Sequence, residues 1–155
     1  MRLTLRTNLA MRTLMVCASN PRRIVRKSEI SVLCNASENH LGQVVRLLAL
    51  HGFVKTIRGR HGGIRLARSA DRINVGAVFR TLEVNHPFAE CFEGGKSTCP
   101  LIASCWLRPA MMEAVEAFYR SLDELYLADL VSSNSELKNI LCLHTLSAEC
   151  ERISN

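Results

Sequence analysis

Apolar residues recur at helical spacing in three segments of the first fifty residues. The first segment covers residues 4–19 and starts from a threonine that can cap a helix. A shorter segment covers about residues 28–35, and a third starts from a serine cap at residue 37 and stops at Gly52. The buried face of this third helix is expected to consist of Leu41, Val44, Val45 and Leu48.

The opposite face of the third helix is polar. Two helices joined by a tight turn, the second of which displays amides, an imidazole and a guanidinium, are typical of a helix-turn-helix. Arginine side chains can pair with guanine, and asparagine or glutamine with adenine, in a major groove. The candidate DNA-contacting residues of this segment are Ser37, Asn39, His40, Gln43 and Arg46. Many soluble helices also have a polar outer face, so this pattern does not decide the function by itself.

A basic β-hairpin is predicted directly after the third helix. Residues 53–57 and 64–67 read as two strands, and residues 58–63 between them form a glycine-rich turn. The glycines keep this turn slim, so that Arg58, Arg60 and His61 can reach a minor groove or flanking phosphates. A hairpin that is merely basic and solvated is the alternative. Together with the helices, the hairpin indicates a winged helix-turn-helix.

The second half of the chain predicts a long helix with an apolar stripe. A short helix over residues 75–83 precedes it, and Pro109 suits the first turn of the long helix. Its stripe is formed by Met112, Val115, Phe118, Leu122 and Leu125. Such a stripe favours packing against a second copy, which in a two-fold dimer would place two recognition helices about one DNA turn apart. Packing within one chain is the alternative.

These patterns predict a mainly α-helical fold with a small β-hairpin. We expect a winged helix-turn-helix DNA-binding domain over residues 1–83 and a cysteine loop followed by the dimerisation helix over residues 84–131. Residues 132–155 have weak helical spacing and are expected to form a marginally ordered tail.

The charge is divided unevenly between the two halves. Residues 1–80 contain 15 Lys and Arg against 3 Asp and Glu, a net charge of +12, whereas residues 81–155 contain 5 against 11, a net charge of −6. A basic block of this size is typical of nucleic-acid binding, because each cation placed on a phosphate releases condensed counterions. No apolar run approaches the length of a membrane span and no signal peptide is recognised, so we expect a cytoplasmic protein with no membrane partner. No residue pattern supports an enzyme.

Three cysteines lie close together in one non-periodic segment. Cys91, Cys99 and Cys105 have the spacing Cys-x7-Cys-x5-Cys, which is too wide for the paired thiols of structural zinc sites. Thiolates presented from several points of a loop suit an iron–sulfur cluster, and with three local thiols one coordination position stays open or is filled from elsewhere. A loop with free or disulfide-bonded cysteines, an electron carrier and a zinc-stapled transcription factor are the alternatives. Cys17 and Cys34 are expected to be structural, and the tail cysteines 142 and 150 need no role.

Residues 1–131 resemble the winged-helix iron–sulfur regulators, which include the nitric oxide sensor NsrR, the iron regulator RirA and the cluster-assembly regulator IscR. The resemblance depends on the three cysteines and on the segments MRLT at 1–4, SENHL at 37–41, RGRHGGIRL at 58–66 and ECF at 90–92. Within this family, INVG at 73–76 and LADLV at 127–131 look most like the nitric oxide sensor. The cysteine spacing fits the iron regulator equally well.

One residue departs from the pattern of the nitric oxide sensors. They carry an aspartate where this chain has Asn8, and the resemblance implies that this carboxylate ligates the partner subunit's cluster. Asparagine at this position is similar to the iron regulators. We expect the fourth iron position to be open, with Asn8 and Arg12 as possible fourth-ligand or orienting groups. Other conceivable ligands are His86, Glu90, Glu93 and His144.

The sequence and the resemblance together lead to a specific expectation. The protein is expected to be a homodimeric repressor that binds a palindromic operator in double-stranded DNA and carries a four-iron rather than a two-iron cluster at Cys91, Cys99 and Cys105. Reaction of the cluster with nitric oxide is expected to release the operator. Response to iron or to cluster status, as implied for the RirA and IscR type, is the alternative.

Overall fold

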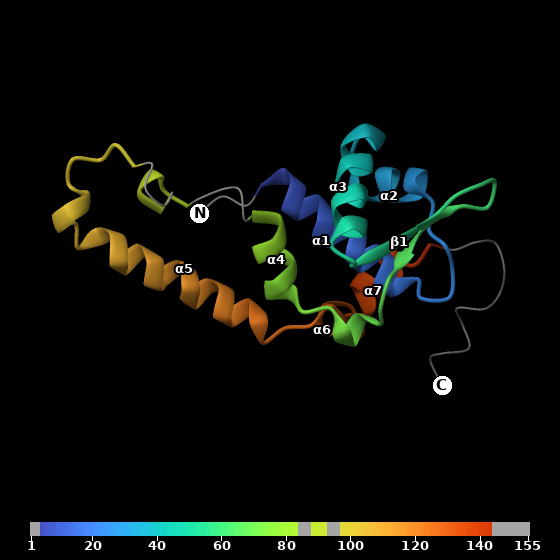
Figure 1. Ribbon diagram of the computed structural model, residues 1–155. Coiled ribbons are helices and arrows are strands. Elements are labelled where there is room, and N and C mark those ends of the chain that lie inside the picture. The colour runs from blue at the N-terminus through green and yellow to red at the C-terminus, as the bar shows by residue number, and fades with distance from the viewer. Residues whose placement is uncertain (1–3, 84–87, 93–96, 144–155) are drawn as a thin grey trace.

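The computed structural model describes residues 4–83, 88–92 and 97–143, which form a helical body with one long projecting helix (Figure 1). The helices are α1 (Leu5–Ser19), α2 (Lys27–Cys34), α3 (Glu38–Leu50), α4 (Val75–Glu83), α5 (Leu107–Asp123), α6 (Leu127–Ser132) and α7 (Ser135–Leu141). The strands are β1 (Val54–Ile57) and β2 (Gly63–Leu66), and short 3-10 turns occur at η1 (Ala70–Arg72), η2 (Glu90–Phe92) and η3 (Ile102–Ser104). The predicted mainly α-helical fold with one small hairpin is confirmed.

Side-chain caps start α1 and α3 where the sequence predicts them. The Thr4 hydroxyl accepts a hydrogen bond from the backbone N–H of Thr7 at 3.2 Å, and the Ser37 hydroxyl accepts one from His40 at 3.2 Å. The predicted apolar face of α3, formed by Leu41, Val44, Val45 and Leu48, is buried. Because α1 and α2 both pack on α3, the core of the molecule holds the helix-turn-helix together and leaves the polar face of α3 outside.

The turn between α2 and α3 is held by local hydrogen bonds. Helix α2 begins at Lys27, in agreement with the predicted start at Ser28 or just before it, and ends at Cys34, where Asn35 follows in the left-handed conformation with φ 48°. The Ser31 hydroxyl then donates to the carbonyl of Ala36 at 2.7 Å. This short turn places α2 and α3 as neighbours, as a helix-turn-helix requires.

The two-stranded wing has one further backbone pairing, an isolated β-bridge, that the sequence pattern did not indicate. Val25, in the connection between α1 and α2, pairs with Ile64 of β2 through two backbone hydrogen bonds of 2.9 and 2.8 Å. The β1–β2 pair itself is antiparallel, and β2 starts at Gly63, within the stretch expected to be the turn. A Cβ atom at Gly63 would lie 2.4 Å from the Val25 carbonyl oxygen, so only glycine allows the backbone of Val25 to approach this closely.

The C-terminal segment is more ordered than expected over the residues that the structure describes. Helix α7 lies on α1, with Leu141 buried in the core. The side chain of Asn20 fixes this contact, because its Nδ2 donates to the carbonyl of Leu141 at 2.8 Å and its Oδ1 accepts from the N–H of Leu143 at 3.0 Å. The structure thus gives residues 135–143 a helix and defined contacts with α1, which their weak helical spacing did not indicate. Helix α6 likewise adds Leu127 to the core.

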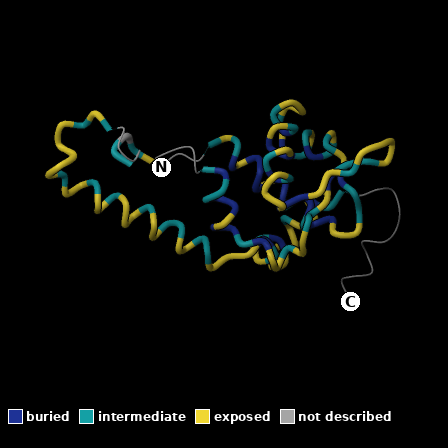
Figure 2. The backbone as a smooth tube through the Cα atoms, in the orientation of Figure 1, coloured by how far each residue is buried: buried dark blue, intermediate teal, exposed yellow. Residues whose placement is uncertain are grey.

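Helix α5 projects from this body (Figure 1). Its side chains are exposed or half-buried along the whole helix, and none is fully buried (Figure 2). The helix ends at Asp123, two residues before the predicted Leu125. There the Asn74 side chain donates to the carbonyl of Asp123 at 2.6 Å, and the backbone N–H of Val75 donates to the carbonyl of Leu125 at 2.9 Å. Among the described helices, none is long and apolar enough to cross a bilayer.

Candidate DNA-binding surface and cysteine loop

The predicted recognition residues lie on the solvent side of α3. Asn39, Gln43 and Arg46 are exposed, and His40 is half-buried at the start of the helix. Ser37 is exposed too, but its oxygen already caps α3, so its hydroxyl proton is the group left for a DNA contact. The body thus presents amide and guanidinium groups at the spacing of one helix face, which is the arrangement that reads base edges in a major groove.

The wing carries the second group of predicted contacts. Arg58, Arg60 and His61 are all exposed in the turn between β1 and β2, and Gly59 adopts a φ of 104°, which favours glycine. Among the described residues, no carboxylate forms an ion pair with these side chains. The cationic groups at the wing tip are therefore available to phosphate oxygens.

Two further cations on the wing were missed by the sequence analysis. Lys55 on β1 lies directly opposite Arg65 on β2, and both side chains are exposed. Like charges directly opposite each other destabilise a strand pair, so an anion bound between them would relieve the repulsion. Only the register of the two strands places these residues together. The basic surface next to α3 is therefore larger than the wing tip alone.

The three predicted cluster cysteines lie on the connection between α4 and α5. Cys91 belongs to η2, Cys99 precedes η3, and Cys105 follows η3 directly. All three are half-buried free thiols. In the described part of the chain, no group of three His, Cys, Asp or Glu side chains is close enough to hold one metal ion. The structure thus places the three thiols on one loop but does not bring them together around a point.

One contact across this loop was not anticipated. The Nε–H of Arg108, in the first turn of α5, donates to the backbone carbonyl of Cys91 at 2.9 Å. This bond joins the two ends of the segment that contains Cys99 and Cys105. No sequence signal marks Arg108, because a single arginine at the start of a helix has many ordinary roles.

Only some of the candidate fourth-ligand residues lie in the part of the chain that the structure describes. Asn8 and Arg12 are both exposed on α1, and the guanidinium of Arg12 donates to the carbonyl of Cys34 at 3.3 Å. Glu90 lies in η2. His86, Glu93 and His144 lie outside the described residues, as does Cys150.

Cys17 and Cys34 have the surroundings of structural cysteines. Both are buried in the core where α1 and α2 pack. Burial, and secondarily the neighbouring Cys34, raises the pKa of the Cys17 thiol to about 12, and burial also raises the pKa of Cys34. Because metal ligation and nucleophilic attack need the thiolate, these two residues are poor candidates for either role.

The donor chemistry of the loop fits an iron–sulfur cluster. Three free thiols, each half-buried and hence reachable from solvent, are the ligand type that such clusters require. Both ends of the loop are held at the start of α5. Its η2 end is bound there by Arg108, and its other end leads directly into the helix. Cys91, Cys99 and Cys105 are the residues that would hold the group.

Comparison with known proteins assigns the family. The Rrf2 family, described as iron-dependent transcriptional regulators, matches residues 3–133. The chain belongs to the Rrf2 family. The match spans the residues of the helix-turn-helix, the wing, the cysteine loop and α5.

Individual Rrf2 relatives agree with this assignment. The chain is 40% identical over 142 residues to the HTH-type transcriptional regulator NsrR of Geobacillus kaustophilus, covering 91% of this chain and 97% of that protein. It is 37% identical to NsrR of Halalkalibacterium halodurans, covering 92% of this chain and 99% of that protein. Protein aau3 of Rhizobium meliloti is 40% identical and covers 92% and 93% of the two chains.

Solved structures support the winged-helix fold of the Rrf2 chain. IscR of T. potens superposes with a TM-score of 0.70 at 21% identity, covering 99% of this chain and 96% of that one. CymR of B. subtilis superposes with a TM-score of 0.67 at 24% identity, covering 87% and 99% of the two chains. The family and its named relatives are transcriptional regulators rather than enzymes, which confirms the expectation of a non-catalytic protein.

Proposed function

We propose that this Rrf2 protein is a dimeric repressor that binds operator DNA while an iron–sulfur cluster is held by Cys91, Cys99 and Cys105, and that releases it when nitric oxide reacts with the cluster. The observation that carries the proposal is the position of the three free thiols. They lie on the connection that leads from α4 to the start of α5, at the end of the helix that projects from the body, so a change at the thiols would act on that end of α5.

The cluster site would be chemically open. Three thiolates leave one iron position to a weaker ligand, and Asn8 is a neutral amide that competes poorly for iron. When bound, a four-iron cluster would supply iron atoms that react with nitric oxide. The chain's own contribution is to hold the thiols on a loop whose ends are tied, with Arg108 attached to Cys91.

The DNA-binding surface would consist of α3 and the wing. Exposed Asn39, Gln43 and Arg46 offer hydrogen bonds to base edges, while Arg58 and Arg60 reach toward the backbone or the minor groove. A palindromic operator follows from a two-fold dimer, because each copy then presents the same reading surface to one half-site.

The dimer contact is proposed to involve α5. The helix has no buried residue, and large apolar side chains at its start are open to solvent, with Trp106 88% exposed and Leu107 65% exposed. An apolar surface of this kind favours association with a second copy. The cysteine loop lies at the same end of the helix, so a second copy there would also cover the cluster site.

A response to iron is the second candidate. The family description names iron dependence, and Asn8 resembles the iron regulators rather than the nitric oxide sensors. Under this candidate, loss of the cluster when iron is scarce would release DNA, and the same three cysteines would be needed.

The test is an anaerobic titration of the cluster-loaded protein with nitric oxide, following visible absorbance and operator binding in the same samples. We expect the absorbance to bleach and operator affinity to fall together at the same molar ratio. Bleaching with unchanged operator affinity would exclude nitric oxide sensing. Release by an iron chelator, with no response to nitric oxide, would favour the iron regulator.

A further inference from the structure

Helix α5 is attached to the body over its C-terminal half. Phe118 meets Phe79 of α4 edge to face with ring centroids 6.2 Å apart, and Leu122 packs against the core while remaining partly exposed. The N-terminal half projects away from the winged helix (Figure 1). With 17 residues and a rise of about 1.5 Å per residue, α5 is about 25 Å long, so a small rotation where it is attached moves its far end substantially.

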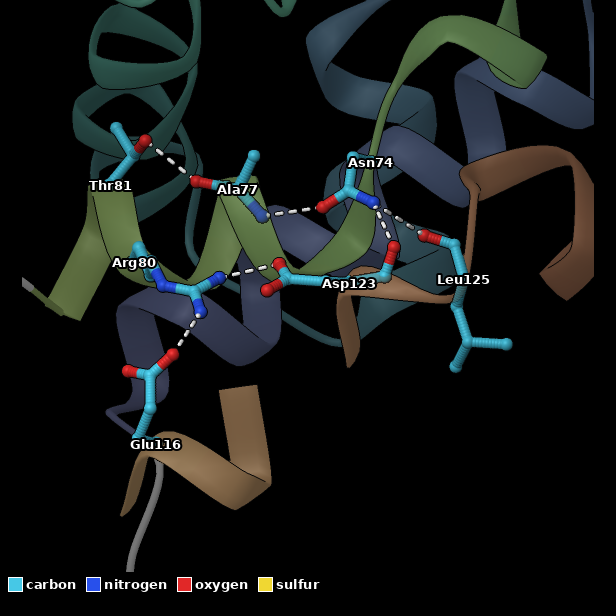
Figure 3. Close-up of polar contacts among 7 residues, drawn as sticks. All are labelled: Asn74, Ala77, Arg80, Thr81, Glu116, Asp123 and Leu125. Atoms are coloured by element: carbon cyan, nitrogen blue, oxygen red, sulfur yellow. Dashed lines mark hydrogen bonds and ion pairs between the residues drawn. The ribbon is translucent and has the colours of Figure 1, made fainter. Parts of the chain in front are cut away.

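The side chain of Arg80 contacts three residues along one face of α5, and two of them, Glu116 and Asp123, are drawn in Figure 3. Its Nη1 lies 2.5 Å from Asp123 Oδ1 and its Nη2 lies 3.2 Å from Glu116 Oε1. Between these two carboxylates, the guanidinium carbon lies 4.7 Å from the ring centre of Tyr119. One guanidinium group thus contacts two turns of α5. Because both of its Nη atoms bind a carboxylate and the group is planar, it restrains the direction of the helix better than a single hydrogen bond would.

Hydrogen bonds of the Asn74 side chain and the Val75 backbone form a latch that holds the end of α5 at the start of α4. Asn74 caps α4 through its Oδ1, which accepts from the N–H of Ala77 at 2.9 Å, and its Nδ2 donates to the carbonyl of Asp123 at 2.6 Å. The N–H of Val75 binds the carbonyl of Leu125 at 2.9 Å. A Cβ atom at Gly76 would lie 2.0 Å from Asp123 Oδ1, so the two helices approach as closely as glycine allows.

The latch and the arginine have different geometric effects. The latch fixes the position of one end of α5 through groups at residues 74–76 and 123–125, but a fixed end still allows the helix axis to swing. Arg80 contacts α5 at Glu116 as well as at Asp123, and two points separated by seven residues define an axis. Together with the contact of Phe118 on Phe79, Arg80 therefore helps to set the direction in which α5 leaves the body.

This contact is poorly suited to stabilising the fold. The side chain of Arg80 is 38% exposed, and those of Asp123 and Glu116 are 38% and 58% exposed. Ion pairs open to solvent contribute little to the free energy of unfolding because water and salt screen them. An arginine that bridges two carboxylates beside an aromatic ring in such a position is better explained by orientation than by stability.

We infer that Arg80 is a positioning residue that transmits the state of the cysteine loop to the DNA-binding surface, by fixing the direction of α5 through Glu116, Tyr119 and Asp123. The inference rests on the proposed function. The cysteine loop adjoins the start of α5, and in the proposed dimer a second copy packs along this helix. A change in either would shift α5, and the shift would reach the body through the contacts of Arg80. Substitution of Arg80 should leave the fold intact and reduce the difference in operator affinity between the cluster-loaded and cluster-free forms.

The first arm of the test needs no cluster. Spin labels at exposed Leu50 on α3 and exposed Ala117 on α5 are introduced as unnatural residues, and labelled chains are mixed with excess unlabelled protein so that intrachain distances are measured. In cluster-free protein we expect a broader distance distribution for Arg80→Gln and an intermediate one for Arg80→Lys. The matched control is Arg120→Gln, an exposed arginine of α5 with no ion pair among the described residues. An unchanged distribution in folded Arg80→Gln would overturn the inference.

The second arm measures operator affinity of both forms. Coupling between sites typically changes affinity by about 5-fold to 150-fold. We expect Arg80→Gln to lower the ratio of operator affinities of the cluster-loaded and cluster-free forms at least about fivefold, toward one. Arg120→Gln should keep the ratio, and thermal unfolding should place both variants close to the wild type. A preserved ratio in Arg80→Gln would overturn the transmitting role. If the wild type itself binds equally in both forms, the proposed sensing function fails, while the first arm still decides whether Arg80 orients α5.

Discussion

Arg108 donates its Nε–H to the backbone carbonyl of Cys91 at 2.9 Å, and this bond connects the start of α5 with the first cysteine of the loop. The two residues are 17 positions apart, and Cys99 and Cys105 lie between them. Closing a loop in this way reduces the freedom of its interior residues before any ligand arrives. The bond thus restricts the segment that carries the three thiols.

Arg108→Ala should weaken the binding of cadmium(II), used as a thiolate probe, to the cluster-free protein. A hydrogen bond of this kind contributes about 0.5–1.5 kcal/mol, so we expect a decrease in affinity of about 2-fold to 10-fold. Sulfur-to-cadmium charge-transfer absorbance measures it. Arg120→Ala is the control on the same helix. Equal cadmium affinity in the two variants would show that Arg108 does not organise the loop.

Replacing any one of Cys91, Cys99 and Cys105 by alanine should abolish the cluster, because two thiolates provide too few anchors. Cys17→Ala and Cys142→Ala should retain it, since Cys17 is buried away from the loop and Cys142 follows α7. Iron and sulfide analysis after anaerobic reconstitution makes the comparison. Full iron content in a variant of the first group would remove that residue from the ligand set.

Arg60→Ala and Gln43→Ala should affect DNA binding in different ways. Loss of the exposed wing arginine should weaken binding to specific and random DNA together and reduce the salt slope by about 1. Loss of Gln43, which faces outward from α3, should cost about 1–3 kcal/mol of discrimination between operators. Fluorescence anisotropy at several salt concentrations separates the two effects. If neither substitution alters binding, the winged-helix surface is not the DNA contact.

Asn8→Ala should keep the cluster if the fourth iron position is open, because the amide then makes no essential bond to iron. Asn8→Asp should supply a carboxylate and slow the exchange of added thiols at the site. Stopped-flow nitrosylation rates of wild type and both variants provide the measurement, with the wild type and Asn8→Ala expected to react fastest. Loss of the cluster in Asn8→Ala would show that the amide, or a group that it holds, is the fourth anchor.

The buried thiol of Cys17 should make stability fall at high pH. Its pKa is about 12 in the folded protein against an ordinary value of 9.0, so the folded state keeps a proton that the unfolded state loses. The contribution is fully present below pH 9.0 and is lost as pH rises toward 12. Between pH 8 and 10, cluster-free wild type should lose about 1 kcal/mol more stability than Cys17→Ala, as measured by urea unfolding. Parallel pH profiles for the two proteins would contradict this assignment.

Much of the winged helix could be predicted from local patterns. The caps at Thr4 and Ser37, the buried face of α3 and the basic hairpin all depend on residues close together in the sequence. Local spacing likewise placed the three thiols on one non-helical segment. Such features are readable because helix and strand periods, caps and turns depend on short-range sterics and hydrogen bonding.

The tertiary structure decided the relationships between distant segments. The Asn20 side chain binds residues 141–143, more than a hundred positions away in the sequence. Val25 pairs with Ile64 of the wing through an isolated β-bridge. Arg80 binds Glu116 and Asp123 on α5. These contacts have no periodic signature, since a single asparagine or arginine reads the same in sequence whether solvated or bonded. The sequence by itself therefore determined the winged-helix elements, the long helix α5 and where the thiols and cations lie along the chain, whereas α6 and α7 were not predicted from it. Which elements meet, and at what angle α5 leaves the body, depended on packing and on polar contacts that exist only after the chain has folded.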